Sequence, residues 1–102
     1  MSNNLQKTEY RTNPNYLIRK VTDQYLLVAV GSTEVMQNKL MTLNETGCFI
    51  WDNLQDFLTI EELIARAKKQ FIDKNGALEQ EICSFVKSLV KLGLIEERSS
   101  KK

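Results

Sequence analysis

Hydrophobic and polar positions follow different periods in the two halves of the chain. In the first half, apolar residues form three strand-like segments, at residues 16–21, 25–30 and 35–43. Alternating or continuous apolar runs of this length are typical of β-strands. The third segment is the most polar and carries Lys39 near its middle, and such a charge suits an edge strand because it discourages unwanted pairing. The pattern predicts a small antiparallel sheet with the third segment at an edge.

The second half changes to a helical period. Asn44 is a good N-cap residue, and Thr59 opens a capping box with Glu62, so helices are expected to begin just after Asn44 and Thr59. Apolar residues then recur every three or four positions along residues 60–71 and 78–90. The predicted fold class is therefore α+β: a winged-helix-like domain in which a three-stranded antiparallel sheet is followed by three helices.

The apolar faces of these helices predict most of the hydrophobic core. Gly47 lies on the same face as Ile50 and Trp51, and glycine inside a helix costs about 1 kcal/mol relative to alanine. Its position therefore indicates the close approach of another backbone. The expected core consists of Gly47, Ile50, Trp51, Leu54, Leu63, Ile64, Phe71, Ile82, Phe85, Val86 and Leu89.

The two ends of the chain are polar and aperiodic. We expect residues 1–14 to be a flexible N-terminal segment, residues 15–97 to form one domain and residues 98–102 to be a flexible tail. No apolar run approaches the roughly 20 residues that span a bilayer, and the N-terminus lacks the apolar region of a signal peptide. The expected location is therefore the cytoplasm, without a membrane partner.

The composition argues against several kinds of functional site. The 102 residues contain no histidine and carry a formal net charge of +1, which argues against a surface that binds nucleic acid through its phosphates. Cys48 and Cys83 are far apart in the sequence, so they form neither a disulfide framework nor a zinc site. No pair of carboxylates lies in an apolar setting that would separate their pKa values. We expect no enzymatic activity, no metal and no cofactor.

Three kinds of binding remain compatible with these elements. A winged-helix DNA-binding or transcription-associated domain has the same parts, but Glu79 and Glu81 near the start of the third helix would face phosphates. A structural homodimer could form if two sheet edges paired with each other. The third possibility is an extended peptide that adds to the edge at residues 38–43 and lies against the third helix. The polar flank of that helix, with Gln80, Ser84, Lys87 and Lys91, could equally be a solvated face.

Several landmarks along residues 17–96 together resemble the PqqD family. They are the paired strands Leu17-Ile-Arg-Lys-Val21 and Tyr25-Leu-Leu-Val28, the step Leu43-Asn-Glu-Thr-Gly47, then Ile50-Trp51, Leu54, Thr59-Ile-Glu-Glu-Leu63, Phe85-Val-Lys-Ser-Leu89 and Leu92-Gly-Leu-Ile95. The resemblance implies a non-catalytic domain of three strands and three helices that binds the leader of a ribosomally synthesised precursor peptide. It further implies that the leader pairs with the third strand and lies against the third helix.

The resemblance also implies a site and partners. The site would comprise Asn38, Lys39, Leu40, Met41, Thr42, Ser84, Lys87, Ser88 and Lys91. The domain would present the precursor to a modifying enzyme, often a radical S-adenosylmethionine enzyme, as a free-standing peptide chaperone. Family members act in pyrroloquinoline quinone biosynthesis and in other peptide pathways, and the landmarks here do not distinguish among these.

Overall fold

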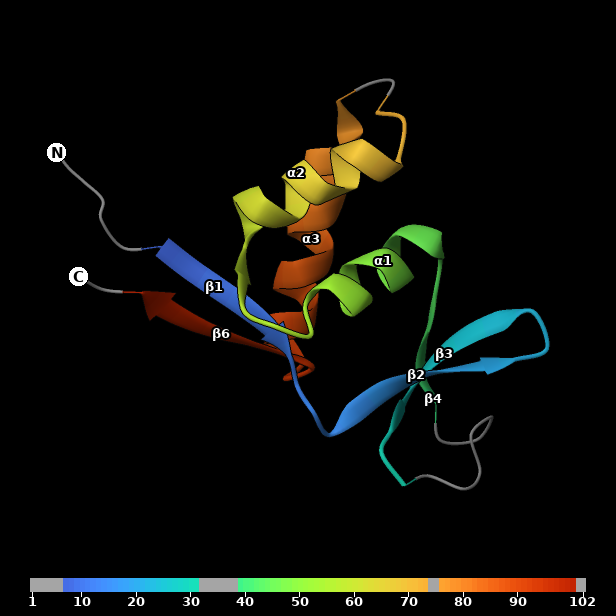
Figure 1. Ribbon diagram of the computed structural model, residues 1–102. Helices are drawn as coiled ribbons and strands as arrows, with labels where there is room; N and C mark the ends of the chain where they lie inside the picture. The colour runs from blue at the N-terminus through green and yellow to red at the C-terminus, as the bar shows by residue number, and fades with distance from the viewer. Residues whose placement is uncertain (1–6, 32–38, 74–75, 101–102) are drawn as a thin grey trace, which may run out of the picture.

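A computed structural model describes residues 7–31, 39–73 and 76–100 of the chain, with the side chains of residues 7 and 100 left out. Two small sheets and three helices make up the fold (Figure 1). In chain order the elements are β1 (Lys7–Thr12), β2 (Tyr16–Val21), β3 (Gln24–Ala29), β4 (Lys39–Leu43), α1 (Glu45–Asn53), β5 (Leu58–Thr59), α2 (Ile60–Gln70), α3 (Ala77–Lys91) and β6 (Ile95–Ser100).

The predicted three-stranded antiparallel sheet is present, with the strand order β2-β3-β4. β2 and β3 form a hairpin with a two-residue loop, in which Thr22 adopts a positive φ of 59°. The continuous apolar run in β3 follows from its central place, since Leu26, Leu27 and Val28 are all buried. β4 forms one edge, as predicted, although residues 35–38 of the expected third segment lie outside the described residues.

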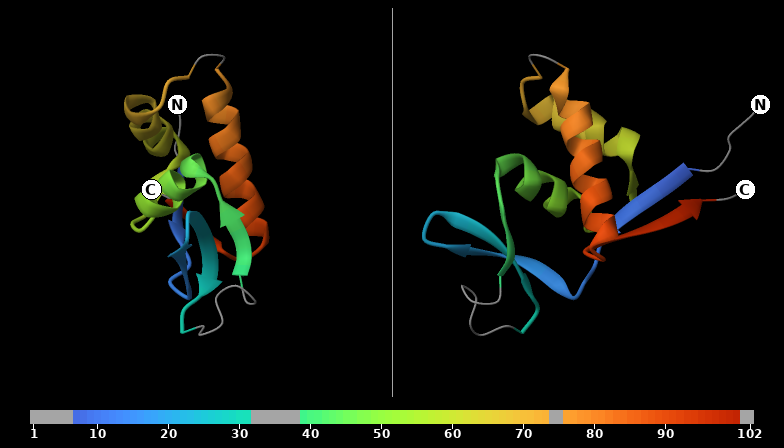
Figure 2. Two further views of the ribbon diagram at one scale, coloured as in Figure 1. Left: turned by 90° about the vertical axis from the view of Figure 1, so that its right-hand side faces the viewer. Right: turned by 180° about the vertical axis from the view of Figure 1, so that it is seen from behind.

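A second sheet, with the order β5-β1-β6, was not predicted. The expectation of flexible ends is wrong for residues 7–12 and 98–100, because β1 pairs with β6 in antiparallel register from Lys7 opposite Ser100 to Thr12 opposite Ile95. This pair extends to one side of the molecule and places residue 7 beside residue 100 (Figures 1 and 2).

Each face of the β1–β6 pair has its own side chains. One face carries two cross-strand ion pairs, Arg11 with Glu96 at 3.0 Å and Arg98 with Glu9 at 2.9 Å. Both guanidinium groups also stack on the ring of Phe57, which adds cation–π attraction. The other face points inward and buries Tyr10. The register is therefore specified on both faces of the pair.

The helix ends agree with the sequence. The Asn44 side chain accepts a hydrogen bond from the Gly47 amide at 2.7 Å, and both bonds of the Thr59–Glu62 capping box are present. Gly93 has a φ of 79°, and the Leu94 amide donates a hydrogen bond to the Leu89 carbonyl. This bond is the 6→1 hydrogen bond of a Schellman C-cap. In the described part of the chain, no helix is long and apolar enough to cross a membrane.

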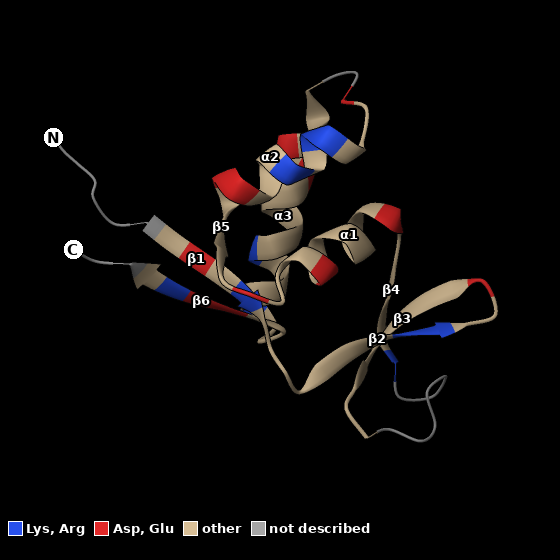
Figure 3. Cartoon of the chain, viewed as in Figure 1, with Lys and Arg blue, Asp and Glu red and all other residues tan. Residues whose placement is uncertain are grey.

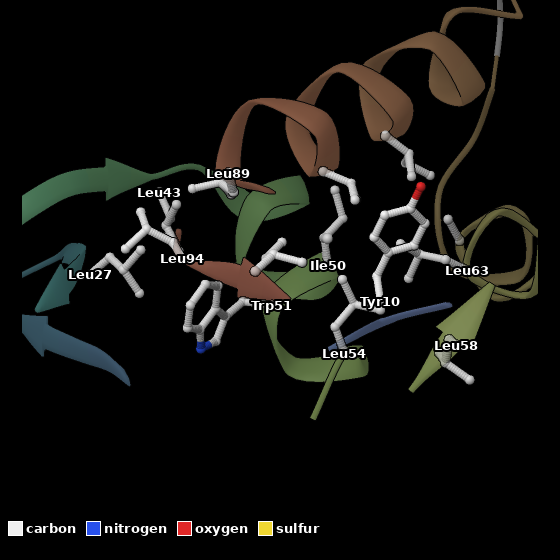
Figure 4. Close-up of a cluster of buried hydrophobic side chains, with 14 of the residues drawn as sticks. Tyr10, Leu27, Leu43, Ile50, Trp51, Leu54, Leu58, Leu63, Leu89 and Leu94 are labelled. Atoms are coloured by element: carbon white, nitrogen blue, oxygen red, sulfur yellow. The ribbon is translucent and has the colours of Figure 1, made fainter. Parts of the chain in front are cut away.

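The core lies between the helices and the inner faces of both sheets (Figure 4). Of the predicted core residues, Ile64, Phe71 and Phe85 are only partly buried and pack against the cluster, while the other eight are buried. The core also contains residues that were not in the predicted core set: Tyr10, Leu27, Leu43, Leu58, Ala67, Leu78, Leu94 and Ile95. The unpredicted sheet therefore contributes directly to the core.

Gly47 lies close to side chains of β4 and α3. A Cβ added there would lie 3.2 Å from the Phe85 ring, 3.2 Å from Asn44 Oδ1 and 3.4 Å from the Leu43 side chain. The glycine therefore makes room for side chains rather than for another backbone, which corrects the expectation from sequence. Through this contact α1 and the end of β4 lie against α3.

Candidate functional site

The outer edge of β4 is open in the part of the chain that the structure describes, since β4 pairs only with β3 there. Leu27 lies opposite Met41 and Val28 opposite Lys39, so Leu40 is an extra residue in β4 and bulges from the ladder. From Met41 to Leu43 the pairing is regular. Backbone N–H and C=O groups along that regular part offer the hydrogen bonds that an added strand needs.

A groove of about 400 Å³ runs between β4 and α3, and we call it the α3–β4 groove. α3 passes beside β4 in both views of Figure 2. The floor and walls are mostly apolar, and two serine hydroxyls lie on the α3 side. The lining residues are Met41, Asn44, Thr46, Gly47, Ile50, Glu81, Ser84, Phe85, Ser88 and Leu89. An open strand edge beside an apolar groove can hold an extended peptide by its backbone and by alternate side chains.

A second cavity of about 530 Å³ lies on the other side of α3, against the β1–β6 pair, and we call it the α3–β6 hollow. Seen from behind, α3 stands between the two sheets (Figure 2, right). The hollow is lined by Tyr10, Ser84, Lys87, Ser88, Val90, Lys91 and Glu97. Ser84 and Ser88 line both cavities, so the exposed surface of α3 at these serines joins the groove to the hollow.

The predicted site residues divide between these two cavities. Met41, Ser84 and Ser88 line the α3–β4 groove, whereas Lys87 and Lys91 line the α3–β6 hollow. The remaining described members, Lys39, Leu40 and Thr42, are exposed on β4 outside both linings. Asn38 falls outside the described residues. Most of the predicted site residues therefore lie on one connected surface that crosses α3.

Sequence reasoning assigned several lining residues to other roles. It placed Gly47, Phe85 and Leu89 in the core and Asn44 at a helix cap, although each also lines the α3–β4 groove. The strongest available signal was Gly47, since a costly helical glycine on an apolar face indicates crowding there. Tyr10 and Glu97 could not be found in this way, because they belong to strands that the sequence did not predict.

The Tyr10 phenol and the Cys48 thiol have shifted acidities. Burial, and then the nearby Glu97 carboxylate, raise the pKa of the Tyr10 phenol above its usual value. Burial, and then Asp52, raise the pKa of the Cys48 thiol. Both shifts favour the neutral, protonated group. The Cys48 thiol is thereby held in its less nucleophilic form, and the Tyr10 hydroxyl remains a hydrogen-bond donor.

The charges around α3 are unevenly distributed (Figure 3). On the amino-terminal part of the helix, Glu79 forms an ion pair with Lys68 at 3.1 Å. Its carboxyl-terminal part carries Lys87 and Lys91, neither of which forms an ion pair with any described residue. The described part of α3 is therefore acidic where it begins and basic where it approaches the β1–β6 pair.

Two comparisons with known proteins agree with this architecture. A solved structure titled "TbiB1 in Complex with the TbiA(beta) Leader Peptide" has a TM-score of 0.62 to this chain, with 16% sequence identity. The superposition covers 84% of this chain and 94% of the other, so the two proteins share a fold. A search of curated protein sequences gave no match.

The sequence model of one protein family matches residues 18–95, which include β2 from Ile18 onward, β3, β4, all three helices and the first residue of β6. That family is described as coenzyme PQQ synthesis protein D, or PqqD. The match leaves out β1 and most of β6, and it covers the α3–β4 groove completely. The chain belongs to the PqqD family.

Proposed function

We propose that this protein binds the leader of a ribosomally synthesised precursor peptide by adding it as a strand to β4. The observation that carries the proposal is the α3–β4 groove beside an open strand edge. Membership of the PqqD family supports it. The shared fold with TbiB1, whose structure is titled as a complex with a leader peptide, supports it as well.

The groove suits a peptide with apolar side chains at alternate positions. In an added strand every second side chain points toward α3, where Met41, Phe85 and Leu89 form an apolar surface. The backbone supplies the hydrogen bonds and the groove supplies the selection among side chains. We expect the bonded stretch to lie opposite Met41–Leu43, since Leu40 bulges from the ladder.

The proposed role is binding and presentation rather than catalysis. A protein that holds the leader leaves the rest of the precursor free for a modifying enzyme, and a radical S-adenosylmethionine enzyme is the partner we propose. We also propose a cytoplasmic location. A homodimer would compete with peptide for the same edge, so we propose that peptide-bound protein is monomeric.

The DNA-binding alternative has weaker support. A recognition helix needs donors aimed at base edges and a basic surface for phosphates. Here Glu79 and Glu81 lie in the first half of α3, and Lys68 is paired with Glu79. No observation specifically favours nucleic acid.

Strand addition predicts a period of two in the peptide backbone. The probe is the tightest-binding leader from a synthetic array of precursor peptides encoded near the gene, with single N-methyl groups placed at successive residues. Methyl groups on amides that bond to β4 should weaken binding by about tenfold or more, because a hydrogen bond is lost and the strands are pushed apart. Methyl groups on the amides between them should have little effect. Titration calorimetry measures each dissociation constant.

Peptides methylated outside the bound stretch are the matched control. Loss of affinity at consecutive positions, or at none, would contradict strand addition.

A further inference from the structure

We propose that the α3–β6 hollow is a second binding position, which receives an acidic side chain of the same peptide outside the stretch that pairs with β4. The inference rests on the proposed leader-binding function and extends it to a charge requirement in the leader. Three features of the hollow support the inference: it adjoins the groove, it contains unpaired positive charge, and β1 and β6 form part of its wall.

The first support is contiguity with the groove. Ser84 and Ser88 line both cavities, and both are exposed. With these small side chains on the α3 surface between the cavities, a peptide leaving the β4 edge can cross the helix without displacing a bulky residue. The hollow, at about 530 Å³, is larger than the groove at about 400 Å³ and can accept a full side chain.

The second support is charge. Arg11, Arg98 and Lys68 are each paired with a carboxylate, but Lys87 and Lys91 have no ion-pair partner among the described residues. Both line the hollow, where Glu97 is the only carboxylate among the described lining residues. The lining therefore carries two cations and one anion, which leaves one positive charge for a ligand to balance. An Asp or Glu side chain has the matching charge.

Tyr10 adds a hydrogen-bond donor at the inner wall. Its hydroxyl points toward α3 in Figure 4, and it forms no hydrogen bond within the described residues. A carboxylate in the hollow would accept this hydrogen bond as well as bonds from the ammonium groups of Lys87 and Lys91. The Glu97 carboxylate repels the same ligand, so it weakens the binding. It therefore favours a peptide whose carboxylate is well placed to accept the hydrogen bonds from Tyr10 and the two lysines.

The third support concerns the wall of the hollow that faces α3. Tyr10 and Glu97 lie outside residues 18–95, the part that the family's sequence model matches. Their strands, β1 and β6, form one wall of the hollow. The acidic position of the leader is therefore expected to depend on Tyr10 and Glu97 as well as on Lys87 and Lys91.

A double-mutant cycle between peptide and protein tests the inference. Each Asp and Glu of the array-selected leader is changed to its amide, and each peptide is titrated into wild-type protein and into Lys87→Gln/Lys91→Gln. At one Asp or Glu outside the N-methyl-sensitive stretch, the peptide with the amide substitution should bind wild-type protein about three- to tenfold more weakly than the unmodified leader. The same change should have no effect on the double variant. Glu97→Gln should tighten binding of the unmodified leader, because a repelling charge is removed.

Lys69→Gln, an exposed lysine on α2, is the matched control and should leave the cycle unchanged. Equal losses for wild type and the double variant would overturn the inference, and so would weaker binding to Glu97→Gln. If the N-methyl period persists in that case, strand addition stands and only the second position fails. If the period is absent as well, the proposed function fails with it.

Discussion

Replacement of Trp51 with alanine is expected to lower the free energy of unfolding by about 3–5 kcal/mol. The indole is only 2% exposed and belongs to the cluster that joins α1 to both sheets (Figure 4). Removing it leaves a cavity that the surrounding elements cannot refill without moving. Because domains of this size are marginally stable, the loss is a large fraction of the total. Urea unfolding followed by far-ultraviolet circular dichroism measures it without relying on tryptophan fluorescence.

Trp51→Phe is the control, since it keeps an aromatic ring in the same place and should retain much more of the stability. The packing described for α1 would be wrong if the alanine variant unfolded at the same urea concentration as the wild type.

Replacement of Ser88 with tryptophan is expected to reduce leader affinity by on the order of a hundredfold, which corresponds to about 3 kcal/mol. Ser88 is exposed on α3 and lines both the α3–β4 groove and the α3–β6 hollow. An indole there would occupy the space that the peptide needs, while its exposed position should leave the thermal unfolding temperature nearly unchanged. Fluorescence anisotropy with a labelled leader measures the affinity.

Ala65→Trp is the matched control, because it also places tryptophan at an exposed position of a helix, here α2. It should bind the leader normally. Wild-type affinity in the Ser88→Trp variant would place the peptide elsewhere on the molecule.

The elements that could be predicted from the sequence are those with local signals. The periodicity of residues 60–71 and 78–90, the cap at Asn44 and the capping box at Thr59 depend on neighbours within one or two turns. The structure confirms all of these, together with the edge place of β4.

The sheet formed by β1 and β6 could not be predicted, because its signal is non-local. Neither segment alternates cleanly between apolar and polar residues. What specifies their pairing is complementarity across the strands, with Arg11 opposite Glu96 and Glu9 opposite Arg98. That match becomes visible only when the register is known, and the partners are 85 and 89 residues apart in the sequence.

The candidate site was predictable to the extent that it follows from a strand edge and a neighbouring helix. Met41, Ser84 and Ser88 lie together, as the strand-addition hypothesis requires. Lys87 and Lys91 were grouped with them from the helical period and the family resemblance, but the helix turns them toward a different cavity. A helical period indicates which residues share a face, and only the packing shows what that face meets.

Amide chemical-shift perturbation with a bound leader tests the central claim most directly. Saturating the isotope-labelled protein with the array-selected leader should shift the amides of Met41–Leu43 in β4 and those from Glu81 to Lys91 in α3, with few changes in α2. Those amides report the strand edge and both cavities at once. Saturating peptide that shifts other residues and leaves β4 and α3 unchanged would contradict the account.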